Sequence, residues 1–129
     1  MIIAIDFDGT IVTHEYPVIG QLMQFRDGVT SFKVMKKLQD KGHKLILYTM
    51  RSGKELEQAV EYCRENGIEF WGVNKNPEQK LWTSSPKIYA NIYIDDAALG
   101  SYTVTKKGVS RMYINWWMVQ KNLIHMGIL

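Results

Sequence analysis

Short apolar runs alternate along this chain with longer segments in which apolar and polar residues recur at helical spacing. The apolar runs cover residues 2–5, 44–48, 68–73 and 91–94. They lack the polar alternation of a half-exposed strand, which favours strands covered on both faces, as in parallel sheets. We therefore predict four strands at these positions.

Three helices are predicted between and after these runs. The first spans about residues 28–41, with Asp27 as candidate N-cap and Gly42 at its end. The second follows a capping box formed by Ser52 and Glu55 and ends at Gly67. The third has one broad apolar stripe, on Met112, Trp116, Val119, Leu123 and Met126.

This order of elements predicts an α/β fold with a three-layer, doubly wound (Rossmann-like) parallel sheet and right-handed crossovers. A chain of 129 residues without an internal repeat or linker is expected to form a single domain over residues 1–129. In such sheets ligands bind at the carboxyl ends of the strands. Candidate chemistry is therefore sought there.

Polar side chains that can bind ligands follow each predicted strand. They are Asp6 and Asp8, then Thr49 and Arg51, then Asn74, and finally Asp95 and Asp96. Two like charges about 4 Å apart repel by about 4 kcal/mol at a surface-like dielectric constant, so four converging carboxylates need a cation or a shared proton. A hard cation with oxygen ligands fits this set, and Mg²⁺ is expected because it uses few carboxylates and keeps bound water.

The segment Asp6-Phe7-Asp8-Gly9-Thr10 combines two carboxylates with a glycine directly after a strand. Gly9 permits a turn and can bring a main-chain N–H close to a phosphate oxygen. The same segment resembles the first motif of the haloacid dehalogenase (HAD) superfamily. The second and fourth motifs of that superfamily resemble Thr49 and the Asp95-Asp96 pair, each at the end of an apolar run.

The third HAD motif, a lysine before the last strand, is less specific in this chain. Lys87 is preferred because Ser85-Pro86 reads as the start of a short helical turn that would hold it. Lys80 and Lys75 remain alternatives, since Lys87 lies only eight positions before Asp95.

The resemblance implies a Mg²⁺-dependent phosphatase. Asp6 would be the nucleophile and form an aspartyl-phosphate, and Asp8 would be the general acid and base. Asp6, Asp8 through its main-chain carbonyl, Asp95 and Asp96 would hold the metal ion. Gly9, Thr49, Arg51 and Lys87 would contact the substrate or its phosphate. His14 and Glu15 lie where the family places a mobile flap and are further candidates for substrate contact.

The spacings leave no room for the cap domain that many HAD enzymes carry. Only 40 residues separate Asp8 from Thr49, and 37 separate Thr49 from Lys87. A capless site suits a large phosphorylated substrate or a lid borrowed from another subunit. The aromatic C-terminal helix is compatible with a homo-oligomer.

Composition changes this picture little. Apolar residues make up 46% and charged residues 22% of the chain, and the first apolar run is too short to cross a bilayer, so we expect a cytoplasmic protein without a membrane partner. The single cysteine, Cys63, is expected to be a buried thiol. The net charge of +3 includes four basic residues after Asp96, which we interpret as a solvated face in preference to a nucleic-acid site.

Other functional classes fit less well. A phosphoacceptor receiver domain needs an aspartate after the third strand, where this chain has Asn74. Both common glycine-rich nucleotide-binding motifs are missing. A catalytically idle relative that keeps the fold and the metal as a binding or scaffold protein remains open, because a fold does not determine a function.

Overall fold

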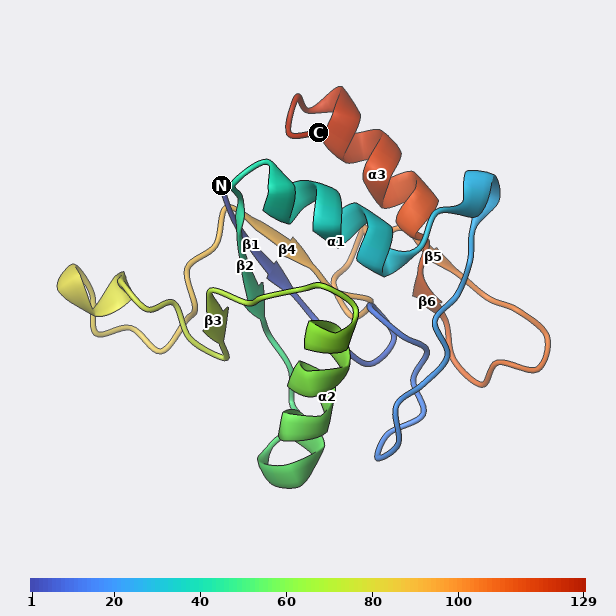
Figure 1. Cartoon of the computed structure of the whole chain (residues 1–129), viewed down its shortest axis with the longest axis horizontal. Helices are drawn as coiled ribbons and strands as arrows, with labels where there is room; N and C mark the ends of the chain where they lie inside the picture. Colours follow the sequence, from blue (N-terminus) through green and yellow to red (C-terminus); the bar gives the residue numbers. More distant parts are fainter.

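The computed structural model describes all residues, 1–129, and has a four-stranded parallel sheet with the strand order β3-β2-β1-β4 (Figure 1). β1 (Ile2–Ile5) lies at the centre, between β2 (Lys44–Leu47) and β4 (Ile92–Ile94). β3 (Gly72–Val73) is shorter than the predicted run 68–73. All four predicted strands exist, and their register places the carboxyl ends of β1 and β4 side by side.

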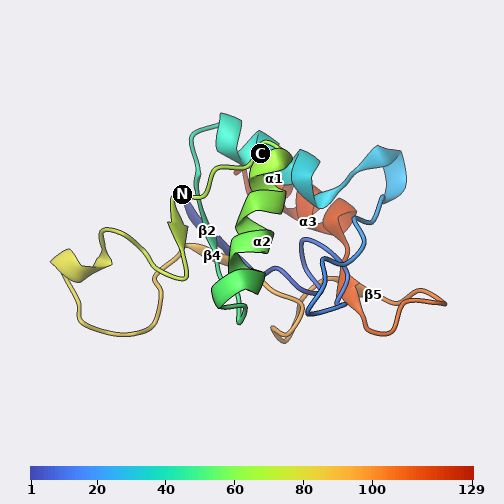
Figure 2. The ribbon, with the colours of Figure 1, turned by 60° about the horizontal axis from the view of Figure 1, so that its bottom comes forward.

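Three α-helices pack on one face of this sheet (Figures 1 and 2). They are α1 (Ser31–Asp40), α2 (Gly53–Glu65) and α3 (Trp116–His125). Alternate strand residues, among them Ile3 and Leu45, join residues of all three helices in a core of 21 buried residues. Cys63 of α2 belongs to this core and is fully buried, as predicted.

The opposite face of the sheet carries no helix, so the predicted three-layer arrangement is wrong in its third layer. Ala4 and Ile46 on that face pack only against Ala90 and a few partly buried neighbours. The crossovers from β1 to β2 and from β2 to β3 run in one direction and place α1 and α2 on the same face. The connection from β3 to β4 runs the other way and would place a helix opposite, but it is a loop.

That loop, residues 74–90, contains only a 3₁₀ turn at Gln79–Leu81 and projects beside β3 (Figures 1 and 2). We call it the lobe. The helical turn predicted after Ser85-Pro86 does not form. Instead, the Lys87 N–H donates a hydrogen bond to Ser85 Oγ across a bend.

The helix ends differ from prediction where another side chain supplies the cap. Thr30, and not Asp27, caps α1 by accepting a hydrogen bond from the Lys33 N–H. Asp27 instead has a left-handed backbone (φ 61°) and accepts a hydrogen bond from Trp117 Nε1. Ser52 precedes α2 as predicted, but its side chain makes no capping hydrogen bond.

The C-terminal helix starts four residues later than its apolar stripe suggests. Asn115 caps it, and residues 113–114 form β6 (Tyr113–Ile114), which pairs with β5 (Thr103–Val104) in an antiparallel ladder. Met112 is therefore outside the helix and half exposed. No helix of the protein combines the length and apolar character needed to cross a membrane.

Candidate metal centre and phosphate site

Three carboxylates meet at the carboxyl edge of the sheet. Asp6 follows β1, while Asp95 and Asp96 follow β4, and oxygen atoms of all three lie within 4.8 Å of one another. We call them the acidic cluster. The predicted meeting of Asp6 with Asp95 and Asp96 is confirmed, because neighbouring parallel strands end together. The predicted fourth member, Asp8, does not join them through its carboxylate.

Thr10 links the carboxylates of the acidic cluster. Its hydroxyl lies 3.0 Å from Asp6 Oδ2 and 3.3 Å from Asp96 Oδ1, and it accepts a hydrogen bond from the Asp96 N–H. Burial, the Asp96 side chain and the charge of Asp95 raise the pKa of Asp6 to about 8, and the Thr10 hydroxyl opposes this shift. Negative charge at Asp6 is thus disfavoured unless a cation joins the cluster.

Asp8 is held by Arg51 in a two-pronged ion pair. Arg51 Nε lies 2.8 Å from Asp8 Oδ2, and Nη2 lies 2.8 Å from Oδ1. Both carboxylate oxygens are occupied, so the side chain that was predicted as general acid and base faces an arginine and not the acidic cluster. The Asp8 side chain is 12% exposed and that of Arg51 only 1%.

Arg51 is occupied by protein acceptors, so its predicted contact with substrate phosphate stays a prediction. Its remaining N–H groups donate to the main-chain oxygens of Pro17, Val18 and Glu55. The guanidinium also lies near the rings of Phe7 and Tyr16, at 4.9 and 5.2 Å from their centroids. Arg51 therefore ties the loop after β1 to Asp8 and to α2, and it has no N–H left for a ligand.

Gly9 has a different role from the predicted one. Its N–H donates to the Val12 oxygen at 2.8 Å and is not free for phosphate. Its φ is +83°, and a Cβ atom there would lie 2.6 Å from Asp96 Oδ2, so only glycine allows Asp96 to approach. The neighbouring N–H groups of Phe7 and Asp8 have no acceptor in the protein.

Thr49 lies two positions after the end of β2 and is nearly buried, at 9% exposure. Its N–H donates to Asn74 Oδ1 at 2.8 Å, and its hydroxyl oxygen accepts a hydrogen bond from the Arg51 N–H. Asn74 has a left-handed backbone (φ 53°), which turns its side chain back towards Thr49. The sequence indicated Asn74 as a strand-end residue but carried no signal for this positioning contact.

None of the three candidate lysines pairs with the acidic cluster. Lys75, Lys80 and Lys87 are exposed on the lobe, and no ion pair joins any of them to Asp6, Asp95 or Asp96. The structure therefore does not select a third-motif lysine. The loop candidates His14 and Glu15 also make other contacts, with Arg111 and Thr13 respectively.

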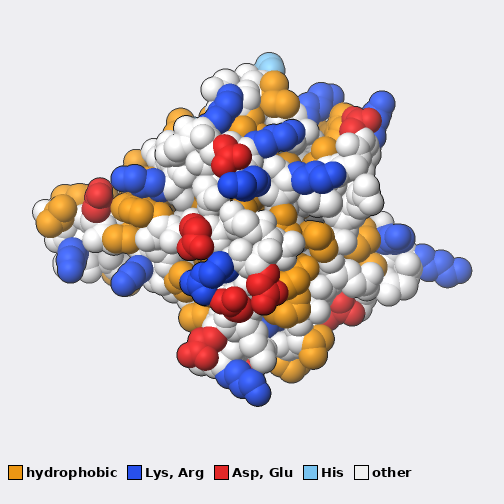
Figure 3. All heavy atoms as spheres, in the orientation of Figure 1, with side chains coloured by type: hydrophobic (Ala, Val, Ile, Leu, Met, Phe, Trp, Pro, Cys, Tyr) orange, Lys and Arg blue, Asp and Glu red, His pale blue; other side chains and the backbone are white.

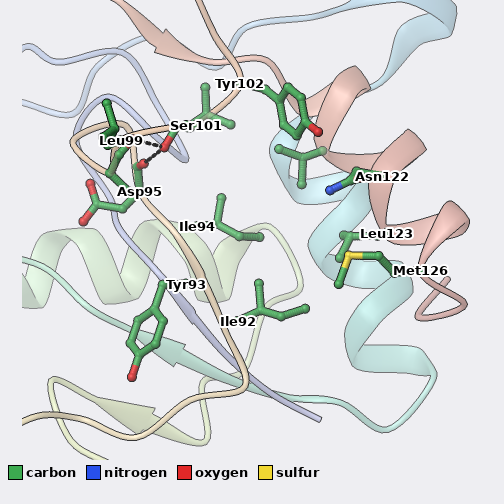
Figure 4. Close-up of a pocket in the computed structure, with 14 residues that line it drawn as sticks. Ile92, Tyr93, Ile94, Asp95, Leu99, Ser101, Tyr102, Asn122, Leu123 and Met126 are labelled. Carbon is green, nitrogen blue, oxygen red and sulfur yellow. Dashed lines mark hydrogen bonds between the residues drawn. The ribbon is translucent and has the colours of Figure 1, made fainter.

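An apolar cavity of about 220 Å³ lies on the other side of β4, between that strand and α3 (Figure 4). Ile92, Ile94 and Leu123 point into it. Tyr93 and the carboxylate of Asp95 project from the opposite side of the strand (Figure 4). Asp95 also lines the cavity, but its carboxylate points away from it (Figure 4).

The donor set of the acidic cluster fits a hard divalent cation. Three carboxylates with oxygen atoms within 4.8 Å of one another supply only oxygen ligands, and no lysine or arginine forms an ion pair with them. The main-chain carbonyl of Asp8 is the predicted fourth donor. Mg²⁺ suits such a small set because it retains several waters.

One solved structure is similar over nearly the whole chain. It is the structure of a conserved protein from Bacteroides thetaiotaomicron, which is 35% identical, with a TM-score of 0.76. The similarity covers 98% of this chain and 91% of the other. No protein-family model matches the sequence, and no curated protein does.

Proposed function

The chain belongs to the same family as the conserved Bacteroides thetaiotaomicron protein. We propose that it is a Mg²⁺-dependent phosphohydrolase of the HAD type, with Asp6 as nucleophile. The observation that carries this proposal is the acidic cluster at the carboxyl ends of β1 and β4. A second supports it: the N–H groups of Phe7 and Asp8, which directly follow Asp6 in the sequence, lack protein acceptors. Carboxylates for a metal and free donors for an anion together suit phosphate chemistry.

In the proposed reaction, a carboxylate oxygen of Asp6 attacks phosphorus while the bond to the leaving oxygen breaks. The resulting aspartyl-phosphate is then hydrolysed by water, which releases inorganic phosphate and restores Asp6. A bound Mg²⁺ would neutralise phosphoryl charge at Asp6, Asp95 and Asp96. The free N–H groups and the Thr49 hydroxyl would hold the remaining phosphoryl oxygens.

Thr10 and Asn74 are positioning residues in this scheme. Thr10 holds the Asp6 and Asp96 side chains at one distance from each other. Asn74 fixes Thr49 through its main chain. Both act before the substrate arrives, which lowers the reorganisation required during the reaction.

The acid and base role proposed for Asp8 requires a change of conformation. Both Asp8 oxygens are bound to Arg51, so Asp8 must release at least one of these hydrogen bonds to serve a leaving group. Arg51 also holds the loop at Pro17 and Val18. Movement of this loop would therefore accompany release of Asp8.

A catalytically idle metal-binding protein is the second candidate. The locked Asp8 and the lack of a lysine at the acidic cluster favour it, since both reduce the groups ready for phosphoryl transfer. Such a protein would still bind Mg²⁺ and gain stability from it. The two candidates therefore differ in turnover and not in metal binding.

Hydrolysis of an aryl phosphate with and without Mg²⁺ tests the proposal. We expect Mg²⁺-dependent turnover that Asp6→Asn lowers by several orders of magnitude, since nucleophile removal in a covalent mechanism has effects of this size. Asp40→Asn, a change on the surface of α1, is the matched control and should turn over like the wild type. Thermal stabilisation by Mg²⁺ without turnover would instead establish the idle protein.

A further inference from the structure

Four partly exposed aromatic side chains lie along the sheet and the lobe: Tyr48 directly follows β2, Tyr93 lies in β4, and Tyr89 and Trp82 belong to the lobe. Tyr48, Tyr93, Tyr89 and Trp82 are 40%, 39%, 41% and 63% exposed. The rings of Tyr48 and Tyr93 lie 6.4 Å apart, and those of Trp82 and Tyr89 lie 5.5 Å apart. Tyr93, Tyr89 and Trp82 also line one cavity of about 330 Å³. The four rings therefore form a continuous series, which we call the aromatic track.

The aromatic track begins at the proposed active site. Tyr48 directly precedes Thr49. Tyr93 projects from the same side of β4 as the Asp95 carboxylate, away from Ile92 and Ile94 (Figure 4). From there the track leads to Trp82 on the lobe. A ligand lying along it would have one end beside the acidic cluster.

Hydrogen bonds hold two of these rings in place. The Tyr93 hydroxyl donates to the Ile88 oxygen and accepts from the Ala90 N–H. The Tyr89 hydroxyl accepts from Asn91 Nδ2. Rings that are already ordered lose little side-chain entropy when a ligand packs on them.

The lobe itself is ordered by the buried side chain of Gln79. Its amide nitrogen donates to the main-chain oxygens of Ser85 and Lys87, and its amide oxygen accepts from the Tyr89 N–H. One side chain thus connects three points of the lobe. Trp82 is therefore exposed on a lobe whose backbone is held by hydrogen bonds.

Positive charge accompanies the aromatic track. The lobe carries Lys75, Lys80 and Lys87, none of which has an acidic partner, and Lys87 lines the same cavity as Trp82. The one acidic residue of the lobe, Glu78, lies 3.8 Å from Lys44. Basic and apolar side chains are mixed where the lobe projects at the left of Figure 3.

We propose that the aromatic track and the lobe lysines bind single-stranded nucleic acid. Bases would stack on the exposed rings, and backbone phosphates would lie against the lysines, the combination by which proteins hold single strands. The assignment of a substrate rests on the proposed function. If the protein is a phosphohydrolase, a terminal phosphate of the bound strand would reach the acidic cluster. An acidic peptide would use the lysines but not four ring faces, and a second copy of this chain would oppose like charges.

Binding is measured with a fluorescein-labelled oligothymidylate that lacks a terminal phosphate, in EDTA, by fluorescence anisotropy. We expect wild-type affinity to fall as salt rises, because lysine contacts release counterions. Trp82→Ala should weaken binding about tenfold or more, while Trp82→Phe should retain most of it. Tyr102→Ala is the matched control: Tyr102 is 41% exposed but lies on the other side of β4, near α3, and its loss should change nothing (Figure 4).

A further variant tests the charge without altering the rings. Lys80 is exposed and makes no ion pair, so Lys80→Glu should fold normally, weaken binding and reduce its salt dependence. Absence of wild-type binding, or equal binding by Trp82→Ala, would overturn the proposal. So would equal competition by a polyglutamate peptide, or a stable dimer that Trp82→Ala dissociates.

The two proposals fail separately. Oligonucleotide binding without hydrolysis of any phosphate ester would refute the proposed phosphohydrolase activity but support the proposed nucleic-acid binding. Aryl phosphate hydrolysis without oligonucleotide binding would refute the surface and keep the enzyme.

Discussion

Asp8 and Arg51, 43 positions apart in the sequence, are joined by two parallel hydrogen bonds of 2.8 Å. This contact connects the first strand end, the second strand end and the loop at Pro17 and Val18. The pair is almost entirely buried, so its charges must compensate each other.

Arg51→Gln should therefore strongly destabilise the protein. Removing one partner of a buried ion pair leaves an uncompensated charge, here on Asp8, at a cost of about 3–5 kcal/mol. Urea unfolding at neutral pH measures this loss. Arg64→Gln is the control, because its pair with Glu61 is half exposed on both sides and should contribute about 1 kcal/mol or less. Similar losses in the two variants would contradict a special role for the buried pair.

The metal-free protein should lose stability between about pH 4 and pH 8. The pKa of Asp6 is raised from 3.8 to about 8, so over this range the folded state retains a proton that the unfolded state has released. The state that binds more protons is disfavoured as pH rises, and here that is the folded state. Thermal unfolding in EDTA across this range measures the effect.

Asp6→Asn should flatten this pH dependence and raise metal-free stability at pH 8. The amide cannot carry a negative charge beside Asp95 and Asp96, so the repulsion is reduced. Mg²⁺ should stabilise wild type more at pH 8 than at pH 5, and should stabilise the variant less. An unchanged pH profile in the variant would show that Asp6 is not the group responsible.

Gly9→Ala should damage the acidic cluster directly. A Cβ at this position meets Asp96 Oδ2 at 2.6 Å, and the left-handed backbone adds a penalty of about 1 kcal/mol. Gly100→Ala is the control for the backbone penalty alone. Gly100 also has a left-handed backbone, with a φ of +88°, but an added Cβ there would meet no atom within 4 Å. Mg²⁺-induced thermal shifts should be lost in Gly9→Ala and kept in Gly100→Ala.

Cys63 should not react with thiol reagents while the protein is folded. The thiol is fully buried, and burial raises its pKa to about 12, so almost no reactive thiolate exists at pH 8. Labelling with an aromatic disulfide should therefore be slow in buffer and complete in urea. Rapid labelling in buffer would show that α2 opens readily from the sheet.

The strands, the helices and the residues at the strand ends could be predicted because their signals are local. The apolar runs at residues 2–5 and 91–94 predict strands without any knowledge of tertiary contacts. Because the two parallel strands end together, they bring Asp6 to Asp95 and Asp96. The start of α1 could not be predicted from the sequence. Thr30 and Asp27 are both good N-cap residues, and only packing selects between them.

The orientation of side chains at the site depended on the tertiary structure. Asp8 and Arg51 each looked ready for a substrate, but the turn at Gly9 and the path of the loop bring them to each other. The aromatic track likewise depends on a missing third layer, since a helix between β3 and β4 would cover Tyr48 and Tyr93. Hydrophobic periodicity specifies which elements form, whereas contacts between distant residues decide where each polar group points.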